Sequence, residues 1–184
     1  MPEEERELDE DEAADLVRRI EAGEDGIAVP QELVEEPEER KAPAPGAGNL
    51  YAQIARMGMA EKLKLALRGN RDARQILIRD GSKLIRRLVM MNPRMTDSEV
   101  IGVTRNKSAD EELLRMITER REWMRNYQVR LGLATNPKAS LPLALKQVGT
   151  LDERDLRLIA KSKNVPAVVA AQARRILMTV KAPK

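Results

Sequence analysis

The sequence predicts an all-α fold, a short right-handed α-solenoid of helical repeats that follows an acidic, mostly disordered N-terminal tail. From residue 50 onward, apolar residues recur at spacings of three and four, which favours amphipathic helices, and strand-like alternation is not sustained anywhere. Gly, Asn and Pro interrupt these apolar segments at intervals. The charge also changes sign along the chain. Residues 1–50 hold 17 Asp and Glu against 5 Lys and Arg, a net charge of −12, whereas residues 51–184 hold 13 against 28, a net charge of +15.

The composition of the 184 residues excludes several classes of site. Cys and His are both absent, so the chain has no disulfide, thiolate zinc site, cysteine nucleophile or imidazole base. The N-terminus MPEEERELDEDEAAD lacks the apolar core of a signal peptide. No stretch has the length and apolarity of a membrane span. We therefore expect a soluble, cytoplasmic protein with no membrane span.

The first 48 residues form an acidic tail that ends in a Pro/Ala/Gly linker, KAPAPGAGN. High charge with few apolar residues predicts that this tail is mostly disordered by itself. Two apolar islands interrupt it, one before Gly23 and one around Pro30. The tail is either a solubilising extension or a docking segment that folds on a partner or on the chain's own basic domain. The candidate docking residues are Leu16, Val17, Ile20, Ile27, Val29, Leu33 and Val34.

Residues 49–184 are predicted to form the basic helical domain. The helical segments, in order, are 60–69, 71–80, 83–91, 97–104, 111–118, 124–135, 141–148, 154–161 and 166–180. The separators are GN at 69–70, DGS at 80–82, NP at 92–93 and 136–137, and NVP at 164–166. The predicted core is aliphatic: Leu63, Leu67, Ile76, Leu84, Leu88, Val100, Leu114, Ile117, Leu131, Leu145, Leu156, Ile159, Val169 and Ile176.

An Asn-Pro corner occurs twice in this domain. Residues 88–101 read LVMMNPRMTDSEVI and residues 132–145 read GLATNPKASLPLAL, 44 positions later. The residue before a proline is disfavoured in helical geometry, so we expect Asn92 and Asn136 to end their helices. Thr96 and Ser140 then occupy N-cap positions of the next helices, and Glu99 gives Thr96 a capping-box pattern.

A second correspondence extends the repeat. LRMIT at 114–118 matches LRLIA at 156–160, which implies a unit of three short helices in 42–44 residues. On these motifs the chain, over about residues 60–180, resembles the HEAT/armadillo-like α-solenoids, in particular the bacterial HEAT-like and leucine-rich-repeat-variant proteins. The predicted repeat units are about 83–123 and 124–165, with terminal helices at 51–80 and 166–180. An irregular helical bundle remains the alternative.

One segment combines aromatic and basic residues. In REWMRNYQVRL, Trp123 and Tyr127 are four positions apart and share a helix face, as do Arg121 and Arg125. The group, which includes Arg130, is either a surface for a peptide, a phosphate or stacked bases, or a structural cluster of core aromatics with solvated arginines. Further basic residues either form a positive stripe on one side of the domain or are ordinary surface charge. These candidates are Lys83, Arg86, Arg87, Arg94, Arg157 and Lys161.

No motif points to catalysis, and we expect no cofactor and no metal ion. The α-solenoid resemblance implies an extended binding surface. The first functional hypothesis is therefore a non-catalytic scaffold or adaptor that binds another protein, with the acidic tail docking or competing for the same surface. The alternative is RNA or DNA binding by the basic domain, modulated by the tail. Homo-oligomerisation through an exposed terminal repeat is a further possibility.

Overall fold

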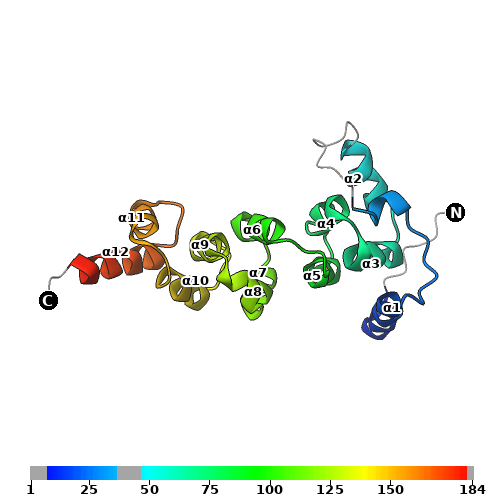
Figure 1. Cartoon of the computed structure of the whole chain (residues 1–184), viewed down its shortest axis with the longest axis horizontal. Helices are drawn as coiled ribbons and strands as arrows, with labels where there is room; N and C mark the ends of the chain where they lie inside the picture. Colours follow the sequence, from blue (N-terminus) through cyan, green and yellow to red (C-terminus); the bar gives the residue numbers. More distant parts are fainter. Residues whose placement is uncertain (1–7, 37–46, 182–184) are drawn as a thin grey trace. The chain divides into compact units, whose positions relative to one another are not determined.

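The computed structural model describes residues 8–36 and 47–181 of the chain. In these ranges the chain forms twelve α-helices, one short 3-10 helix and no strand, which confirms the all-α prediction (Figure 1). The chain divides into two compact units, unit 1 (Met1–Met95) and unit 2 (Thr96–Lys184). This division cuts the predicted repeat unit 83–123 in two.

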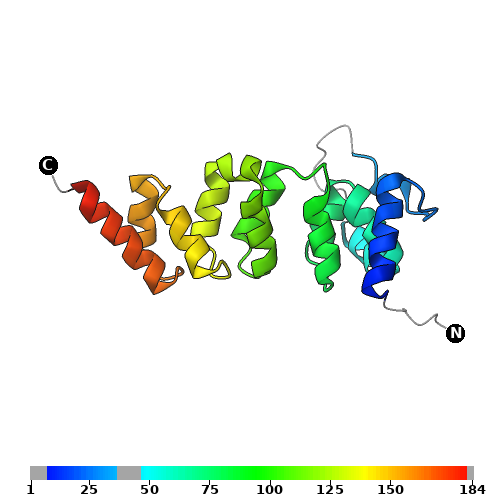
Figure 2. The same cartoon turned by 90° about the horizontal axis from the view of Figure 1, so that it is seen from below.

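Unit 1 is built around the helix α3. Its elements are α1 (Glu10–Ala22), the 3-10 helix η1 (Gln31–Leu33), α2 (Ala47–Ala55), α3 (Met59–Arg68), α4 (Arg71–Leu77) and α5 (Lys83–Met91). The helix α3 packs against α1, α4 and α5, and both cartoon views show α1 alongside it (Figures 1 and 2). Leu63, Leu65 and Ile85 are fully buried in the core that these helices share.

Residues 8–36 of the acidic N-terminal region are folded, whereas the prediction was of a mostly disordered tail. Asp9 caps α1 through a capping box with Glu12, and Gly23 ends the helix in the left-handed conformation at φ 77°. Residues 8–36, here called the acidic segment, contribute Ile20 and Leu33 to the core of unit 1. The prediction treated the segment as isolated, whereas its apolar residues are buried against the rest of unit 1. Residues 1–7 and 37–46 lie outside the described ranges. Most of the predicted linker, KAPAPGAGN at 41–49, falls in the second of these gaps, and its last three residues belong to α2 rather than to a linker.

Unit 2 contains the remaining helices: α6 (Asp97–Arg105), α7 (Glu111–Glu119), α8 (Arg121–Arg125), α9 (Tyr127–Thr135), α10 (Leu141–Val148), α11 (Glu153–Lys161) and α12 (Ala167–Lys181). The helix α9 packs against α6 and α10, and α12 packs against α10 and α11. Small residues allow the close contacts: a Cβ on Gly132 of α9 would lie 2.1 Å from the Thr104 hydroxyl oxygen of α6. Ala134 and Ala144 are buried in the cluster that joins α9, α10, α11 and α12.

Both Asn-Pro corners end a helix as predicted. The helix before Asn92 ends at Met91, and the helix before Asn136 ends at Thr135. Thr96 is the N-cap of α6, and the Glu99 carboxylate accepts hydrogen bonds from both the Thr96 backbone N–H and the Thr96 hydroxyl. Ser140 occupies the N-cap position of α10 without a side-chain capping bond. The capping box at Thr96 is therefore confirmed, and the side-chain role expected of Ser140 is not.

The two corner asparagines make the same hydrogen bonds. The Asn92 side-chain amide donates to the carbonyls of Ala66 at 3.0 Å and Gly69 at 3.4 Å, at the end of α3. The Asn136 amide donates to the carbonyls of Thr104 at 2.7 Å and Asn106 at 2.9 Å, at the end of α6. Because these hydrogen bonds are equivalent, the group α3–α5 corresponds to the group α6–α9. The structural correspondence therefore begins at residues 59 and 97, whereas the predicted units begin at 83 and 124.

Most of the predicted core residues of 49–184 are buried. Leu63, Leu67, Leu88, Val100, Leu114, Ile117, Leu156, Ile159 and Val169 are buried, whereas Ile76, Leu84, Leu131, Leu145 and Ile176 are half-buried. The half-buried residues lie at the edges of their apolar faces, where the helical spacing alone does not distinguish core from margin.

Candidate functional site

The seven predicted docking residues all lie in the core of unit 1 or against it. Ile20 and Leu33 are each 1% exposed. The other five, Leu16, Val17, Ile27, Val29 and Val34, are partly buried and pack on the same core cluster. The acidic segment is therefore bound by its own chain, through apolar side chains on the inner face of α1 and along residues 27–34.

A lysine of α3 fixes the middle of the acidic segment. The Lys64 ammonium donates to Asp25 Oδ1 at 2.7 Å and to the Ile27 carbonyl at 2.6 Å. Asp25 also accepts a hydrogen bond from the Ile27 backbone N–H. The hydrogen bond from Lys64 lowers the pKa of Asp25 below its ordinary value of 3.8, against the opposing effect of burial. The ionised Asp25 carboxylate thus holds the chain in the turn that follows α1.

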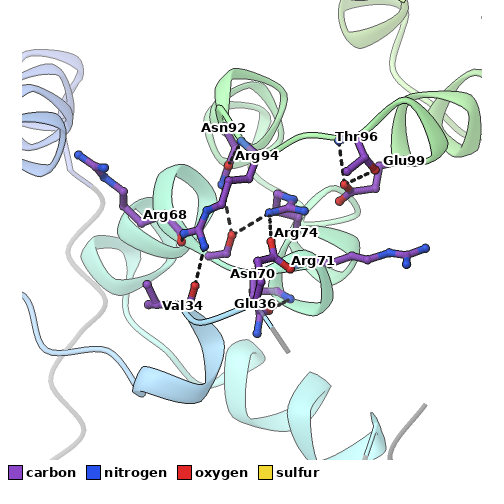
Figure 3. A network of polar contacts seen from close by, with 12 residues as sticks. Val34, Glu36, Arg68, Asn70, Arg71, Arg74, Asn92, Arg94, Thr96 and Glu99 are labelled. Carbon is purple, nitrogen blue, oxygen red and sulfur yellow. Dashed lines mark hydrogen bonds and ion pairs between the residues drawn. The ribbon is translucent and has the colours of Figure 1, made fainter. Parts of the chain in front are cut away.

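Three polar side chains of unit 1 recognise the main chain of the acidic segment rather than its carboxylates. Arg68 donates to the Glu21 carbonyl at 2.8 Å. The Asn70 amide donates to the carbonyls of Glu32 and Glu35 at 2.7 and 3.0 Å. Arg94 donates to the Val34 carbonyl at 2.8 Å and also to the Arg68 carbonyl (Figure 3). These bonds satisfy carbonyls at the ends of α1 and α3 and around the short 3-10 helix, where helical partners are missing.

A buried arginine closes the network at the end of the acidic segment. Arg74 of α4 is 2% exposed. Its guanidinium donates to Glu36 Oε1 at 2.8 Å and to the Gly69 carbonyl at 3.1 Å (Figure 3). Glu36 also accepts from the Arg71 backbone N–H at 3.3 Å, at the start of α4. A buried guanidinium needs such a counter-charge, so Glu36 has a structural role.

The charges of unit 1 compensate each other. The acidic segment holds eleven Asp and Glu against two Lys and Arg, a net charge of −9. Residues 47–95 hold three against eleven, a net charge of +8. Residues 96–184 hold ten against seventeen, a net charge of +7. Within unit 1, the negative charge of the acidic segment offsets the positive charge of residues 47–95. Residues 96–184 of unit 2, in contrast, keep their net positive charge.

The aromatic candidates in unit 2 are structural. Trp123 is 5% exposed, and the Arg120 guanidinium lies over its ring, 4.5 Å from the centroid. The Tyr127 hydroxyl donates to Asp155 Oδ2 and accepts from the Asp152 N–H at 3.2 Å, which joins α9 to the start of α11. Burial, followed by the hydrogen bond to Asp155, raises the pKa of Tyr127. These two rings do not form the predicted surface for stacked bases.

The predicted basic residues are divided between the two units and have different roles. In unit 1, Arg86 donates to the carbonyls of Asp80 and Gly81, and Arg94 holds the acidic segment. Both arginines are therefore structural. In unit 2, Arg157 pairs with Glu153 one turn earlier on an exposed helix face. The Arg130 guanidinium lies over the Tyr127 ring, 5.6 Å from its centroid. The remaining candidates, Lys83, Arg87, Arg121, Arg125 and Lys161, are exposed.

Unit 2 contains a groove that no pattern in the sequence predicted. It has a volume of about 390 Å³ and lies where the ends of α6 and α9 meet α11. Leu131, Leu158, Ile159 and Val165 provide apolar walls, and Arg105 and Lys107 are the basic residues that line it. Leu158 is 63% exposed. The apolar Leu158 on the exposed face of α11 is the only local indication of this groove. Helical spacing alone does not show that other helices form walls around it.

Within the described residues, no cluster of three acidic side chains is arranged to hold a metal ion, and no helix is long and apolar enough to cross a membrane. No family model, curated protein or solved structure matches the chain.

Proposed function

We propose that the protein is a non-catalytic interaction module, a scaffold or adaptor, and that unit 2 binds an acidic segment of another protein. The observation that carries this proposal is the unequal charge of the two units. Unit 1 neutralises its cations with its own acidic segment, whereas residues 96–184 keep a net charge of +7. A surface with uncompensated charge attracts a partner of opposite charge and accelerates their encounter.

The manner in which unit 1 holds the acidic segment supports the same proposal. There, aliphatic side chains enter the core while Arg68, Asn70 and Arg94 donate to main-chain carbonyls. Recognition of an acidic, aliphatic peptide by helix ends is therefore already present within this chain. Unit 2 has the same kind of helix ends and a net charge of +7, whereas unit 1 as a whole has a net charge of −4.

The helical arrangement further supports a repeat scaffold of the HEAT/armadillo-like type. The last helix of each group packs on the first: α5 on α3, α9 on α6, and α12 on α10. Short amphipathic helices of this kind become stable by sharing a core with their neighbours. On this proposal the three groups are successive repeats, and the function depends on the surface that the repeats present.

The acidic segment has a constitutive structural role in this proposal, rather than that of a competitor for the binding surface. Displacing the segment would expose Ile20 and Leu33, which are each 1% exposed in the folded chain. It would also leave Arg74, which is 2% exposed, without the Glu36 carboxylate. Both effects oppose release, because burial of apolar side chains and pairing of a buried charge stabilise the docked state.

Binding of the full chain to a labelled polyglutamate peptide, measured by fluorescence anisotropy, tests the proposal. We expect a dissociation constant in the micromolar range that weakens as salt is raised, because the attraction is screened. Single-stranded RNA and duplex DNA of matched charge are measured in parallel. Tight nucleic-acid binding with a steep salt dependence, and no binding of the peptide, would replace the proposal with the nucleic-acid alternative.

A further inference from the structure

The groove in unit 2 lies at a corner that corresponds to an occupied corner of unit 1. Arg68 is the last residue of α3, and Arg105 is the last residue of α6. Asn92 bonds to carbonyls at the end of α3, and Asn136 bonds to carbonyls at the end of α6. The residue two positions after each asparagine is basic, Arg94 in unit 1 and Lys138 in unit 2, and its backbone N–H donates to that asparagine.

The basic residues of the two corners differ in what they bind. In unit 1, Arg68 and Arg94 donate to carbonyls of the acidic segment. In unit 2, Arg105 donates to Gln128 Oε1 at 2.6 Å, within the unit. The side chains of Lys107 and Lys138 are exposed and make no hydrogen bond or ion pair with any residue in the described ranges. The corner of unit 2 therefore has cations available for a second chain.

The groove beside this corner is large enough to take up a side chain and has apolar walls. Its volume of about 390 Å³ falls within the range of about 300–1,000 Å³ that is typical of ligand pockets. Leu131, Leu158 and Ile159 form an apolar surface that an aliphatic side chain can cover. One carboxylate lines the groove, that of Asp155, and it already accepts a hydrogen bond from the Tyr127 hydroxyl.

We propose that this groove binds an acidic segment of a partner protein through an aliphatic anchor, in the manner of the Leu33–Val34–Glu35–Glu36 stretch in unit 1. The anchor packs on Leu158 and Ile159, and Arg105 and Lys107 bind the carbonyls or carboxylates of the adjoining residues. The inference rests on the proposed function and specifies its site. Two observations favour an acidic segment as the ligand: the basic Arg105 and Lys107 line the groove, and the corresponding corner of unit 1 already holds such a segment.

The test uses the full chain and a labelled peptide with the sequence of residues 27–36, IAVPQELVEE. We expect micromolar binding that falls at least tenfold in the double variant Arg105→Glu, Lys107→Glu. The matched control is Lys146→Glu, Arg175→Glu, which makes the same change of net charge at two exposed positions of unit 2 outside the groove. The control is expected to weaken binding less than threefold. Equal weakening by both double variants would overturn the groove as the site.

A second pair of variants tests the aliphatic anchor without changing charge. Leu158→Ser removes an apolar wall, and we expect about tenfold weaker binding, as loss of part of a buried leucine contact implies. Leu141→Ser, on an exposed leucine of α10 outside the groove, is the control and should leave binding unchanged. Circular dichroism confirms that each variant is folded.

The two proposals fail in different ways. If IAVPQELVEE does not bind, or binds with no sensitivity to the groove variants, the groove proposal is wrong. If polyglutamate still binds the same chain in that case, the proposed function of unit 2 stands and its site lies elsewhere. If neither peptide binds, both proposals are wrong.

Discussion

At the scale of single residues, buried amide side chains join helix ends that are far apart in sequence. Asn92 is 0% exposed and Asn136 is 3% exposed, and each uses its amide hydrogens on two carbonyls and its oxygen on a backbone N–H. Each side chain thus provides bonds that free carbonyls at a buried helix end require. No shorter polar residue offers both donors and an acceptor in this geometry.

We predict that Asn92→Ala and Asn136→Ala each lower the free energy of unfolding by about 1–3 kcal/mol, because buried carbonyls lose their donors. Urea denaturation followed by circular dichroism measures the change. Asn164→Ala, at an exposed asparagine, is the control and should stay within about 0.5 kcal/mol of the wild type. Losses below that limit for both corner variants would show that these bonds do not stabilise the fold.

A second prediction concerns the ionised carboxylate of Asp25. Because Lys64 lowers the pKa of Asp25, the pair contributes stability above the ordinary value of 3.8, and the contribution is lost as pH falls through the lower folded pKa. Asp25→Asn should therefore be less stable than the wild type at pH 7, by about 1–2 kcal/mol. The difference should shrink below pH 3.8. Glu24→Gln, at an exposed neighbour, is the control; a difference that is constant down to pH 2 would contradict the assignment.

The sequence predicted those side-chain contacts whose two partners lie within one helical turn of each other. The capping box of Thr96 and Glu99 lies within one helical turn, so its spacing is visible in the sequence. The side-chain amides of Asn92 and Asn136 donate hydrogen bonds to carbonyls 26 and 32 residues away, and no local sequence rule specifies those partners. The prediction that Trp123 and Tyr127 share a helix face is wrong, because the extended Asn126 separates α8, which holds Trp123, from α9, which begins at Tyr127. Only the tertiary packing decides that Trp123 is buried.

At the scale of elements, the main difference between prediction and structure is the acidic segment. Its composition favours disorder when it is considered alone. The structure buries Ile20 and Leu33 in the core of unit 1. Lys64 holds the Asp25 carboxylate, and Arg68 and Arg94 hold main-chain carbonyls of the segment. Apolar residues at helical spacing within an acidic sequence indicated this element, and the complementary basic surface explains why it folds there.

Leu33→Ala should destabilise unit 1 by about 2–5 kcal/mol, because it removes a fully buried side chain from a packed core. The neighbouring Glu32→Ala, at an exposed position, should change the free energy of unfolding by less than about 0.5 kcal/mol. Chemical denaturation of the full chain, followed through amide signals of α3, compares them. Similar small effects of the two substitutions would mean that the segment is only loosely attached.

At the scale of the whole molecule, the charge asymmetry is visible in the sequence, but the compact units of the structure meet at Met95 and not at residue 48. The boundary at residue 48 gave a tail of −12 and a domain of +15. The structure divides at Met95, so the acidic segment belongs with α3–α5, and the net charges of residues 1–95 and 96–184 become −4 and +7. The assignment of acidic residues to unit 1 is what leaves unit 2 as the basic surface. Sequence composition cannot reveal this assignment, because it depends on which helix the segment contacts.

Hydrogen exchange of the full chain near neutral pH tests this assignment most directly. If the acidic segment is part of unit 1, the backbone amides in the second half of α1, near Ile20, should exchange on the order of a hundredfold more slowly than unprotected amides, in common with amides of α3. If the amides of α1 exchange at unprotected rates while those of α3 remain protected, the acidic segment is not part of unit 1 and the charge argument for unit 2 fails.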